Sequence, residues 1–430
     1  MASAAVRALA KVRTPRVTLE QLTGEVADRR RAGAYLHNVL PPLLARMAVS
    51  LEDGAPASLA GLPAFDELIE WYGDSAARIA AVSPPPEWAT WRTKPSETFL
   101  DRERKFGDAL DEVRLAGKQV RAKVFDALDS SGWLHKTPQT SDEVDLFLRD
   151  FYARRLTLRL LLGQHQACRE ALTGESAYLW ATFDGLDANY DGVLEPEELL
   201  KAKSLYDAQA DALQTHPKPS VCGLVDREMS PFDVSVQAIA DVQEEVLRSP
   251  HNPEHLLPRF RLFGLGEGAT IPFLPRHLYK IIRDVLRNAA RAAFLRAQAT
   301  GEPMGEVTVV ISDADDNSDV VVKVSDTAGG IPRSKLKKIF SFSAASRSYG
   351  EVANDLADQS LCHALGPAAL GGAAPDVLSP AADSAEGHAL PLAKVYATLF
   401  GGDLKLLSME GHGTDCYVYI SRIEDNVLPT

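Results

Sequence analysis

The sequence predicts an α+β protein: a helical N-terminal half followed by an α/β sandwich. Apolar residues recur at three- and four-residue spacing through residues 20–172, with no convincing strand between them. After about residue 255, β-branched runs arranged as hairpins alternate with amphipathic helices. Of the 430 residues, 45% are hydrophobic and 24% are charged, which excludes a largely disordered or fibrous chain.

Charge and composition exclude several classes of function. The chain has 46 Lys and Arg against 59 Asp and Glu, a net charge of −13, which disfavours non-specific binding to nucleic acid. It has no run of about 18 apolar residues, so we expect no membrane-spanning helix. The four cysteines are far apart and form no CxxC pair, so we expect neither a disulfide scaffold nor structural zinc; a reducing compartment fits. They are Cys168, Cys222, Cys362 and Cys416.

Residues 1–20 have the composition of an organelle transit peptide. Arg7, Lys11, Arg13 and Arg16 lie among small residues, and no acidic residue precedes Glu20. Transit peptides are rich in arginine and poor in acidic residues, whereas the alternative is a disordered basic tail. We expect a mitochondrial address.

Residues 21–172 are expected to form a four-helix bundle. Helical spacing of apolar residues is clear over 35–47, 65–81 and 147–168. Prolines cluster between these stretches, at Pro84–Pro86 and Pro138, where they end helices. Packing the apolar stripes against one another would bury them in a bundle core.

Residues 218–430 are expected to form the sandwich. Polar turns join Val307–Ile311 to Val320–Ser325 and Leu404–Leu407 to Asp415–Ile420, so both pairs read as hairpins of an antiparallel or mixed sheet. Helices are expected over 275–298, 332–340 and 390–400. The intervening segment 341–386 is rich in Ala, Ser, Gly and Asp, and such a long loop indicates a lid or a disordered segment.

Residues 173–217, between the two parts, contain a calcium-binding EF-hand pattern at 187–198. Gly192 occupies the sharp turn of the twelve-residue loop, and oxygen ligands occupy the other diagnostic positions. Flanking apolar patterns predict a helix on each side. The alternative is a solvated acidic turn. The expected Ca²⁺ ligands are Asp187, Asn189, Asp191, the carbonyl of Val193, Glu195 and Glu198.

The helix that follows Pro275 presents three polar residues on one face. Asp284, Asn288 and Arg291 recur at i, i+4 and i+7, above an apolar stripe. A carboxylate one turn from an amide could orient a nucleophile and hold hydrated Mg²⁺ beside a triphosphate. Taken alone the trio is a weak signal, because an ordinary exposed helix face looks similar.

Three later segments strengthen this interpretation. Asp326–Pro332 follows a strand, and its carboxylate could accept from an exocyclic amine while its glycines permit close backbone approach. Glu386–Pro391 precedes a helix whose first N–H groups could bind phosphate. Gly411–Asp415 opens the last strand. Together they indicate a nucleotide site.

The order of these motifs resembles the mitochondrial 2-oxoacid dehydrogenase kinases, which act on pyruvate or branched-chain complexes and carry an ATP site of the gyrase and histidine kinase (GHKL) type. The resemblance covers most of residues 30–172 and 218–422. It rests on Pro275–Tyr279, Asp284–Ala292, Asp326–Pro332, Leu390–Pro391, Tyr396–Ala397, Gly402–Leu404 and Ser408–Asp415, and in the helical half on Leu68–Tyr72 and Phe147–His165.

The resemblance implies a role for individual residues. Asn288 corresponds to the Mg²⁺ ligand, Asp326 to the residue that reads adenine, and Asp284 to the general base that takes a proton from a substrate serine. The other nucleotide-binding positions that it implies are Arg291, Gly330, Gly387, His388, Ala389, Leu390 and Thr414.

It also implies a reaction and partners. The chain would be a matrix protein serine kinase that uses ATP and Mg²⁺ to phosphorylate and inactivate the dehydrogenase subunit of a 2-oxoacid complex. Recruitment through the lipoyl-bearing acyltransferase core and a homodimeric state would follow, and the inserted EF-hand could make the activity sensitive to Ca²⁺. The alternatives are a catalytically impaired relative that binds the complex in response to calcium, and a GHKL ATPase with another target.

Four departures from the family pattern support the impaired alternative. Asp284 is one methylene shorter than the usual glutamate, and a displacement of about 1 Å can cost on the order of 100-fold in rate. Alanine replaces glycine at Ala328, Ala385 and Ala389, which is unfavourable by roughly 1–2 kcal/mol wherever φ is positive. Gly117 stands where the family has a histidine that pairs with the base.

Overall fold

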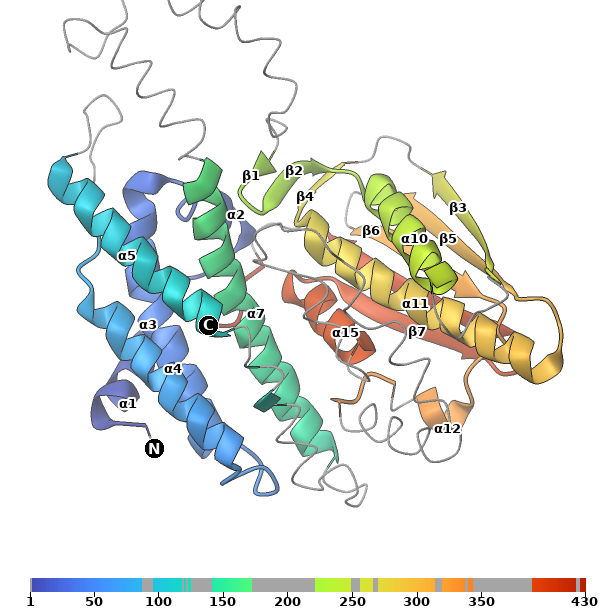
Figure 1. The fold of residues 1–430 in the computed structure, drawn as a ribbon, viewed down its shortest axis with the longest axis horizontal. Helices are drawn as coiled ribbons and strands as arrows, with labels where there is room; N and C mark the ends of the chain where they lie inside the picture. The colour runs from blue at the N-terminus through green and yellow to red at the C-terminus, as the bar shows by residue number, and fades with distance from the viewer. Residues whose placement is uncertain are drawn as a thin grey trace, which may run out of the picture.

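The protein is described here by a computed structural model (Figure 1). It describes residues 2–86, 96–117, 120, 123–124, 141–171, 221–248, 256–265, 270–313, 319–336, 339–342, 389–422 and 426–430. The expected EF-hand loop, most of the expected lid and the residues Gly387 and His388 lie outside these ranges. Within them, no helix is both long and apolar enough to cross a membrane.

Four long helices lie side by side in the N-terminal half, which confirms its predicted helical character (Figure 1). The helix Arg29–Asp53 is capped by the Asp28 carboxylate, which accepts from the N–H of Arg30. The helix Glu97–Ala116 is capped by the Ser96 hydroxyl, which accepts from the N–H of Phe99. The first helix continues through Pro41 and Pro42. The four helices are α3 (Arg29–Asp53), α4 (Pro63–Ala81), α5 (Glu97–Ala116) and α7 (Ser141–Ala171).

The first residues of the chain pack against this helical half. α1 (Ala4–Ala10) lies on α3 with Val6 buried, and α2 (Leu19–Thr23) follows. Arg7 pairs with Asp53 at 2.6 Å. Removal of the segment would expose these buried surfaces, and its expected role as a transit peptide stays a prediction.

The C-terminal half contains a five-stranded mixed sheet in the order β3-β5-β6-β8-β7. β3 and β5 are parallel, and the other neighbours are antiparallel. Both predicted hairpins, β5–β6 and β7–β8, are confirmed. The strands are β3 (Arg259–Leu265), β5 (Glu306–Asp313), β6 (Asp319–Asp326), β7 (Asp403–Met409) and β8 (Gly413–Ser421).

Helices cover one face of this sheet (Figure 1). In β5 and β6 every second side chain is buried, and α11 packs over β5, β6 and β8. Pro275 at the first helical position and Gly301 in the left-handed conformation set the limits of α11. The helices on this face are α10 (Pro231–Arg248), α11 (Pro275–Thr300) and α15 (Ala389–Leu399). The short α12 (Arg333–Leu336) follows β6 in the chain.

A small sheet links the two halves and was not predicted. It contains β1 (Val221–Cys222), β2 (Val225–Met229) and β4 (Ile271–Phe273) in the order β1-β2-β4. Strands of two to five residues show too little alternation to be recognised in a sequence.

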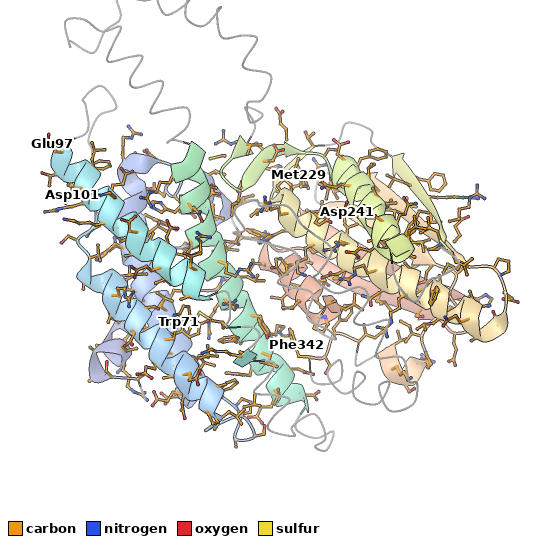
Figure 2. All side chains as sticks on the ribbon, in the orientation of Figure 1. Trp71, Glu97, Asp101, Met229, Asp241 and Phe342 are labelled. Carbon is orange, nitrogen blue, oxygen red and sulfur yellow. The ribbon has the colours of Figure 1, made fainter. Side chains whose placement is uncertain are left out.

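The two halves share one continuous core. α15 contacts both α7 of the helical half and α11 of the sandwich. Beside α7, Phe342 stacks on Tyr152 with ring centroids 5.3 Å apart (Figure 2). The C-terminal segment also crosses between the halves, since the N–H of Leu428 donates to the carbonyl of Val17 at 2.7 Å.

Candidate functional site

Three of the predicted site residues meet at one end of the five-stranded sheet. Asp326 ends β6 and is the register partner of Thr414 at the start of β8. The loop after Asp326 carries Gly330. The Thr414 hydroxyl lies 3.0 Å from that of Ser408 on β7, and the Ser408 hydroxyl accepts from the N–H of Ile331 at 2.7 Å. Two motifs far apart in the sequence therefore form one surface.

The Asp326 carboxylate is fixed in position by backbone N–H groups. It accepts from the N–H of Ala328 at 2.9 Å and from the backbone of Thr414. Burial is the largest cause of the raised pKa of Asp326, and the two backbone hydrogen bonds partly oppose it. A carboxylate has about four lone-pair positions, so acceptor capacity remains for a ligand N–H.

The loop after Asp326 requires glycine at position 330, where its backbone comes closest to the turn between β7 and β8. Gly329 and Gly330 have φ angles of 87° and 72°. A Cβ on Gly330 would lie 2.2 Å from the carbonyl oxygen of Met409. The N–H of Gly329 donates to the backbone carbonyl of His412 at 3.2 Å, and the N–H of Gly411 donates to the carbonyl of Gly329 at 2.8 Å. The loop is thereby tied to the β7–β8 turn.

Asp284 is buried, which distinguishes it from the ordinary exposed helix face that would give a similar sequence pattern. Its carboxylate accepts from Lys280 Nζ at 3.0 Å, and the two side chains are 3% and 5% exposed. The ammonium of Lys280 also lies 5.8 Å from the ring centroid of Tyr396 on α15. The proposed base therefore faces a cation and the interface between α11 and α15.

Lys280 is a site residue that sequence reasoning missed. It lies one turn before Asp284 on the same helix face, a spacing that pairs opposite charges. That spacing was the available signal. At the end of α5, Gly117 has no side chain that could pair with a carboxylate, and its carbonyl accepts from Arg155 at 2.9 Å.

Further charges surround this part of α11. Arg283 and Arg287 pair with Glu245 of α10, and the Tyr279 hydroxyl donates to Asp241, which is labelled in Figure 2. Burial is the largest cause of the lowered pKa values of both arginines. These contacts hold α10 against α11 and fix the helix that carries the polar trio.

Asn288 and Arg291 are suited to bind Mg²⁺ and phosphate. The Nδ2 of Asn288 donates to the carbonyl of Asp284 at 2.7 Å, which leaves its Oδ1 as the atom for a hard cation. The Nε of Arg291 is buried and has no hydrogen-bond partner among the described residues. Because an unsatisfied buried donor is costly, an anionic ligand at this point would stabilise it. The residues therefore fit a Mg²⁺–nucleotide.

α11, which carries the polar trio, packs across β6 and β8, the two strands whose ends bring Asp326 and Thr414 together. Arg296, on α11 beyond Arg291, reaches the loop after Asp326, since a Cβ on Gly329 would lie 2.5 Å from its Nη1. Ala389 and Leu390 begin α15, whose first N–H groups lack intrahelical partners. Both are partly buried. Among the predicted nucleotide-binding positions, Gly387 and His388 lie outside the described residues.

The six expected Ca²⁺ ligands lie outside the described residues. Among the residues that the structure does describe, no group of three or more His, Cys, Asp or Glu side chains could hold a metal ion. Ca²⁺ binding therefore stays a prediction that rests on the loop pattern.

Comparison with known protein families gives two matches. Residues 16–195 match the family model described as mitochondrial branched-chain alpha-ketoacid dehydrogenase kinase. Residues 274–363 match the model described as histidine kinase-, DNA gyrase B- and HSP90-like ATPase. The second match includes the whole of α11 and the loop after Asp326.

Relatives with curated names agree with these matches. The chain is 25% identical to a mitochondrial pyruvate dehydrogenase (acetyl-transferring) kinase of Arabidopsis thaliana, over 92% of this chain and 86% of that protein. It is 24% identical to a Schizosaccharomyces pombe protein of the same name, over 77% of this chain and 63% of that one. With human isozyme 1 of this kinase it shares 25% identity, over 68% of this chain and 52% of the relative.

The two family models match successive parts of this chain. The first covers the helical half, and the second covers α11, β5, β6 and α12 of the sandwich. The relatives match across both halves. These matches support the mitochondrial 2-oxoacid dehydrogenase kinase family for this chain and a GHKL-type ATPase domain in its C-terminal half.

Proposed function

We propose that the chain is a mitochondrial protein kinase that transfers phosphate from Mg²⁺–ATP to a serine of the dehydrogenase subunit of the pyruvate dehydrogenase complex and thereby inactivates it. The names of the relatives support the substrate class and the location. The observation that carries the proposal is the packing of α11 across β6 and β8, the strands whose ends bring Asp326 and Thr414 together. That arrangement supplies a base-reading carboxylate, a cation ligand and an anion-binding donor.

Each residue has a defined task in this mechanism. Asp326, held by two backbone N–H groups, accepts a hydrogen bond from the exocyclic amine of adenine. Asn288 offers Oδ1 to Mg²⁺, which neutralises charge on the phosphates when bound, and Arg291 donates to phosphate oxygen. Asp284 accepts the proton of the substrate hydroxyl as that oxygen attacks phosphorus. Lys280 orients this carboxylate.

The second candidate function is a nucleotide-binding relative that occupies the complex without transferring phosphate. The buried Lys280–Asp284 pair favours it, because a base must lie within hydrogen-bond reach of the proton it takes. For catalysis, the substrate serine would have to displace Lys280 or approach the second carboxylate oxygen.

Phosphate transfer to purified pyruvate dehydrogenase distinguishes these two functions. Radiolabelled ATP and the wild-type chain should label the dehydrogenase subunit, and Asp284→Asn should reduce labelling by at least about 100-fold while calorimetry shows unchanged ATP binding. Asp326→Asn should abolish ATP binding itself. Tight ATP binding without labelling would establish the second function, and absence of ATP binding would overturn both.

We further propose that residues 187–198 bind Ca²⁺ and modulate this activity. The support is the position-by-position match of the loop to an EF-hand. Calorimetric titration of Ca²⁺ should give one site in the wild type and none in Glu198→Gln. Kinase activity that is identical with Ca²⁺ and with chelator would remove the regulatory part of the proposal and leave the binding part.

Two assembly properties complete the proposal, namely a homodimer and recruitment by the lipoyl-bearing acyltransferase core. Both rest on the resemblance of the chain to this kinase family. Light scattering during gel filtration tests the first, and co-sedimentation with lipoylated and unlipoylated acyltransferase tests the second. Equal sedimentation with both forms would contradict recruitment through the lipoyl group.

A further inference from the structure

Two cysteines that are far apart in the sequence meet where the helical half joins the sandwich. Cys168 lies in the last turns of α7, and Cys222 forms the end of β1. Both are free thiols, Cys168 buried and Cys222 partly exposed. The two thiols share a hydrogen bond. Spacing along the chain gave no sign of this pair.

The turn that carries Cys222 is held firmly against α7. Gln164, one turn before Cys168, donates from Nε2 to the carbonyls of Leu22 at 3.1 Å and Cys222 at 2.9 Å. Its Oε1 accepts from the N–H of Leu224 at 2.7 Å. A single amide thus connects α2, α7 and the β1–β2 turn and holds Cys222 opposite Cys168.

Gly223 permits the close approach of the two cysteines. Its φ is 62°, and a Cβ there would lie 2.7 Å from the Sγ of Cys168 and 2.6 Å from the Oε1 of Gln164. Any larger residue would push the turn away from α7. The backbone beside Cys222 is therefore in van der Waals contact with the partner sulfur.

The environment makes one of the two thiols more acidic. The hydrogen bond from Cys168 is the largest cause that lowers the pKa of Cys222 below its usual value, burial opposes it, and the charge of Arg227 also lowers it. The same hydrogen bond, together with burial, raises the pKa of Cys168. The Cys222 sulfur also lies 3.8 Å from the carbonyl of Thr23. A thiolate nucleophile and a neighbouring thiol are the two groups that disulfide formation requires.

We propose that Cys168 and Cys222 form a reversible disulfide site, oxidised by a hydroperoxide and reduced by a dithiol. The Cys222 thiolate attacks the peroxide oxygen and the O–O bond breaks. The leaving hydroxide or alkoxide takes up from solvent the proton that the thiol had released, so the products are a sulfenic acid and water or an alcohol. The Cys168 sulfur then attacks the sulfenic sulfur, the S–O bond breaks, and the second water leaves with the Cys168 proton. Two thiols lose two electrons, and one peroxide gains them.

The bond would connect the end of α7 covalently to the first strand after the inserted segment. It would join the helical half to the sandwich at the point where Gln164 already holds them together. The inference is independent of kinase activity, because it requires only the fold of this junction.

Peptide mapping of the full-length protein tests the proposal. Cys362, which lies outside the described residues, is replaced by serine in every protein used. Native protein is exposed to hydrogen peroxide at pH 7, alkylated and digested without reductant. Mass spectrometry should find the Cys168–Cys222 linked peptide as the main product, and dithiothreitol should remove it. Cys222→Ser should abolish the link, and Cys416→Ser should leave it unchanged.

A kinetic measurement supplies a second readout. Before oxidation, iodoacetamide should modify Cys222 at least about 10-fold faster than Cys416, whose pKa burial raises to about 12. In Cys168→Ser, peroxide should drive Cys222 to sulfinic acid, since no second thiol remains to resolve the sulfenic acid. Sulfinic acid at Cys222 without the linked peptide in the protein that retains Cys168, or equal alkylation of Cys222 and Cys416, would overturn the proposal.

Discussion

Lys280 and Asp284 show how much one contact within the site depends on tertiary burial. Their spacing on α11 predicts that they can meet, but an exposed pair of this kind contributes only a few tenths of a kcal/mol. In the structure both side chains are almost fully buried against α15. Two buried charges tolerate each other only as a pair, so the loss of one partner is much more costly than the loss of both.

This dependence predicts a non-additive stability series. Lys280→Met should lower the free energy of unfolding by about 3–5 kcal/mol, because it leaves the carboxylate of Asp284 buried without its cation. The double variant Lys280→Met/Asp284→Leu should recover most of that loss. Urea denaturation provides the measurement, with Lys405→Met as an exposed control. Additive losses in the double variant would show that the pair is not coupled.

Gly330 and Gly301 separate two reasons for requiring glycine. Both have positive φ, but a Cβ on Gly301 would meet nothing within 4 Å, whereas one on Gly330 would meet the Met409 carbonyl at 2.2 Å. Gly301→Ala should cost about 1–2 kcal/mol in backbone strain alone. Gly330→Ala should cost roughly 1–3 kcal/mol more and should also weaken ATP binding. Equal losses of stability and unchanged ATP affinity in both would contradict the assigned close approach.

The raised pKa of Asp326 predicts how ATP affinity depends on pH. Burial, its largest cause, makes the folded protein hold the proton more tightly. That contribution to stability is fully present below the ordinary aspartate pKa of about 3.9 and disappears as pH rises through the folded value. A protonated Asp326 loses acceptor capacity, so ATP affinity should fall on acidification at a pH above that ordinary value. Calorimetry from pH 8 down to about pH 4, close to the ordinary aspartate pKa, tests this, and an affinity that is constant over the whole range would refute the assignment of Asp326 as the adenine acceptor.

At the scale of single elements, the sequence predicted most of what the structure contains. Long amphipathic helices and β-branched hairpins have clear periodicity, and α7, α11 and the β5–β6 hairpin lie where it placed them. The strands of the β1-β2-β4 sheet are too short to show any periodicity. The packing of the N-terminal segment was missed for another reason: its basic composition describes a targeting peptide equally well, and composition does not reveal burial of a residue such as Val6.

Arg46 holds this N-terminal segment and provides a test of its packing. Its guanidinium donates to Ala10 at 3.0 Å, to Thr14 at 3.2 Å and to the carbonyl of Val12. Arg46→Met should release the segment and increase the rate of trypsin cleavage after Lys11 severalfold, because local opening controls proteolysis. Arg78→Met, which removes an exposed pair with Glu112, is the control. Equal cleavage rates would indicate that Arg46 does not anchor the segment.

At the scale of the whole molecule, the sequence predicted two parts but not how they meet. Periodicity identifies which face of a helix is apolar, and it carries no information on which distant element covers that face. The contact between Tyr152 and Phe342 and the thiol pair at Cys168 and Cys222 both join residues from different halves. For the same reason, the sequence could name the residues of the nucleotide site one by one, but it could not show that Asp284 is buried in an ion pair with Lys280.

The C-terminal segment is the most direct test of whether the two halves unfold together. Leu428 is 1% exposed, and its N–H donates to Val17 beside α2, while Asn426 donates to the carbonyl of Phe400 at the end of α15 at 2.9 Å. Leu428→Ala should lower the free energy of unfolding by about 2–4 kcal/mol, because truncation of a buried leucine leaves a cavity at this crossing. If the crossing couples the halves, scanning calorimetry should also show the single transition broaden or separate into two. Val427→Ala is the matched control. The Val427 side chain, next to Leu428 in the sequence, is 54% exposed, so its truncation should change stability by less than about 0.5 kcal/mol. A Leu428→Ala protein with the same midpoint and peak shape as Val427→Ala would mean that the segment only rests on the helical half.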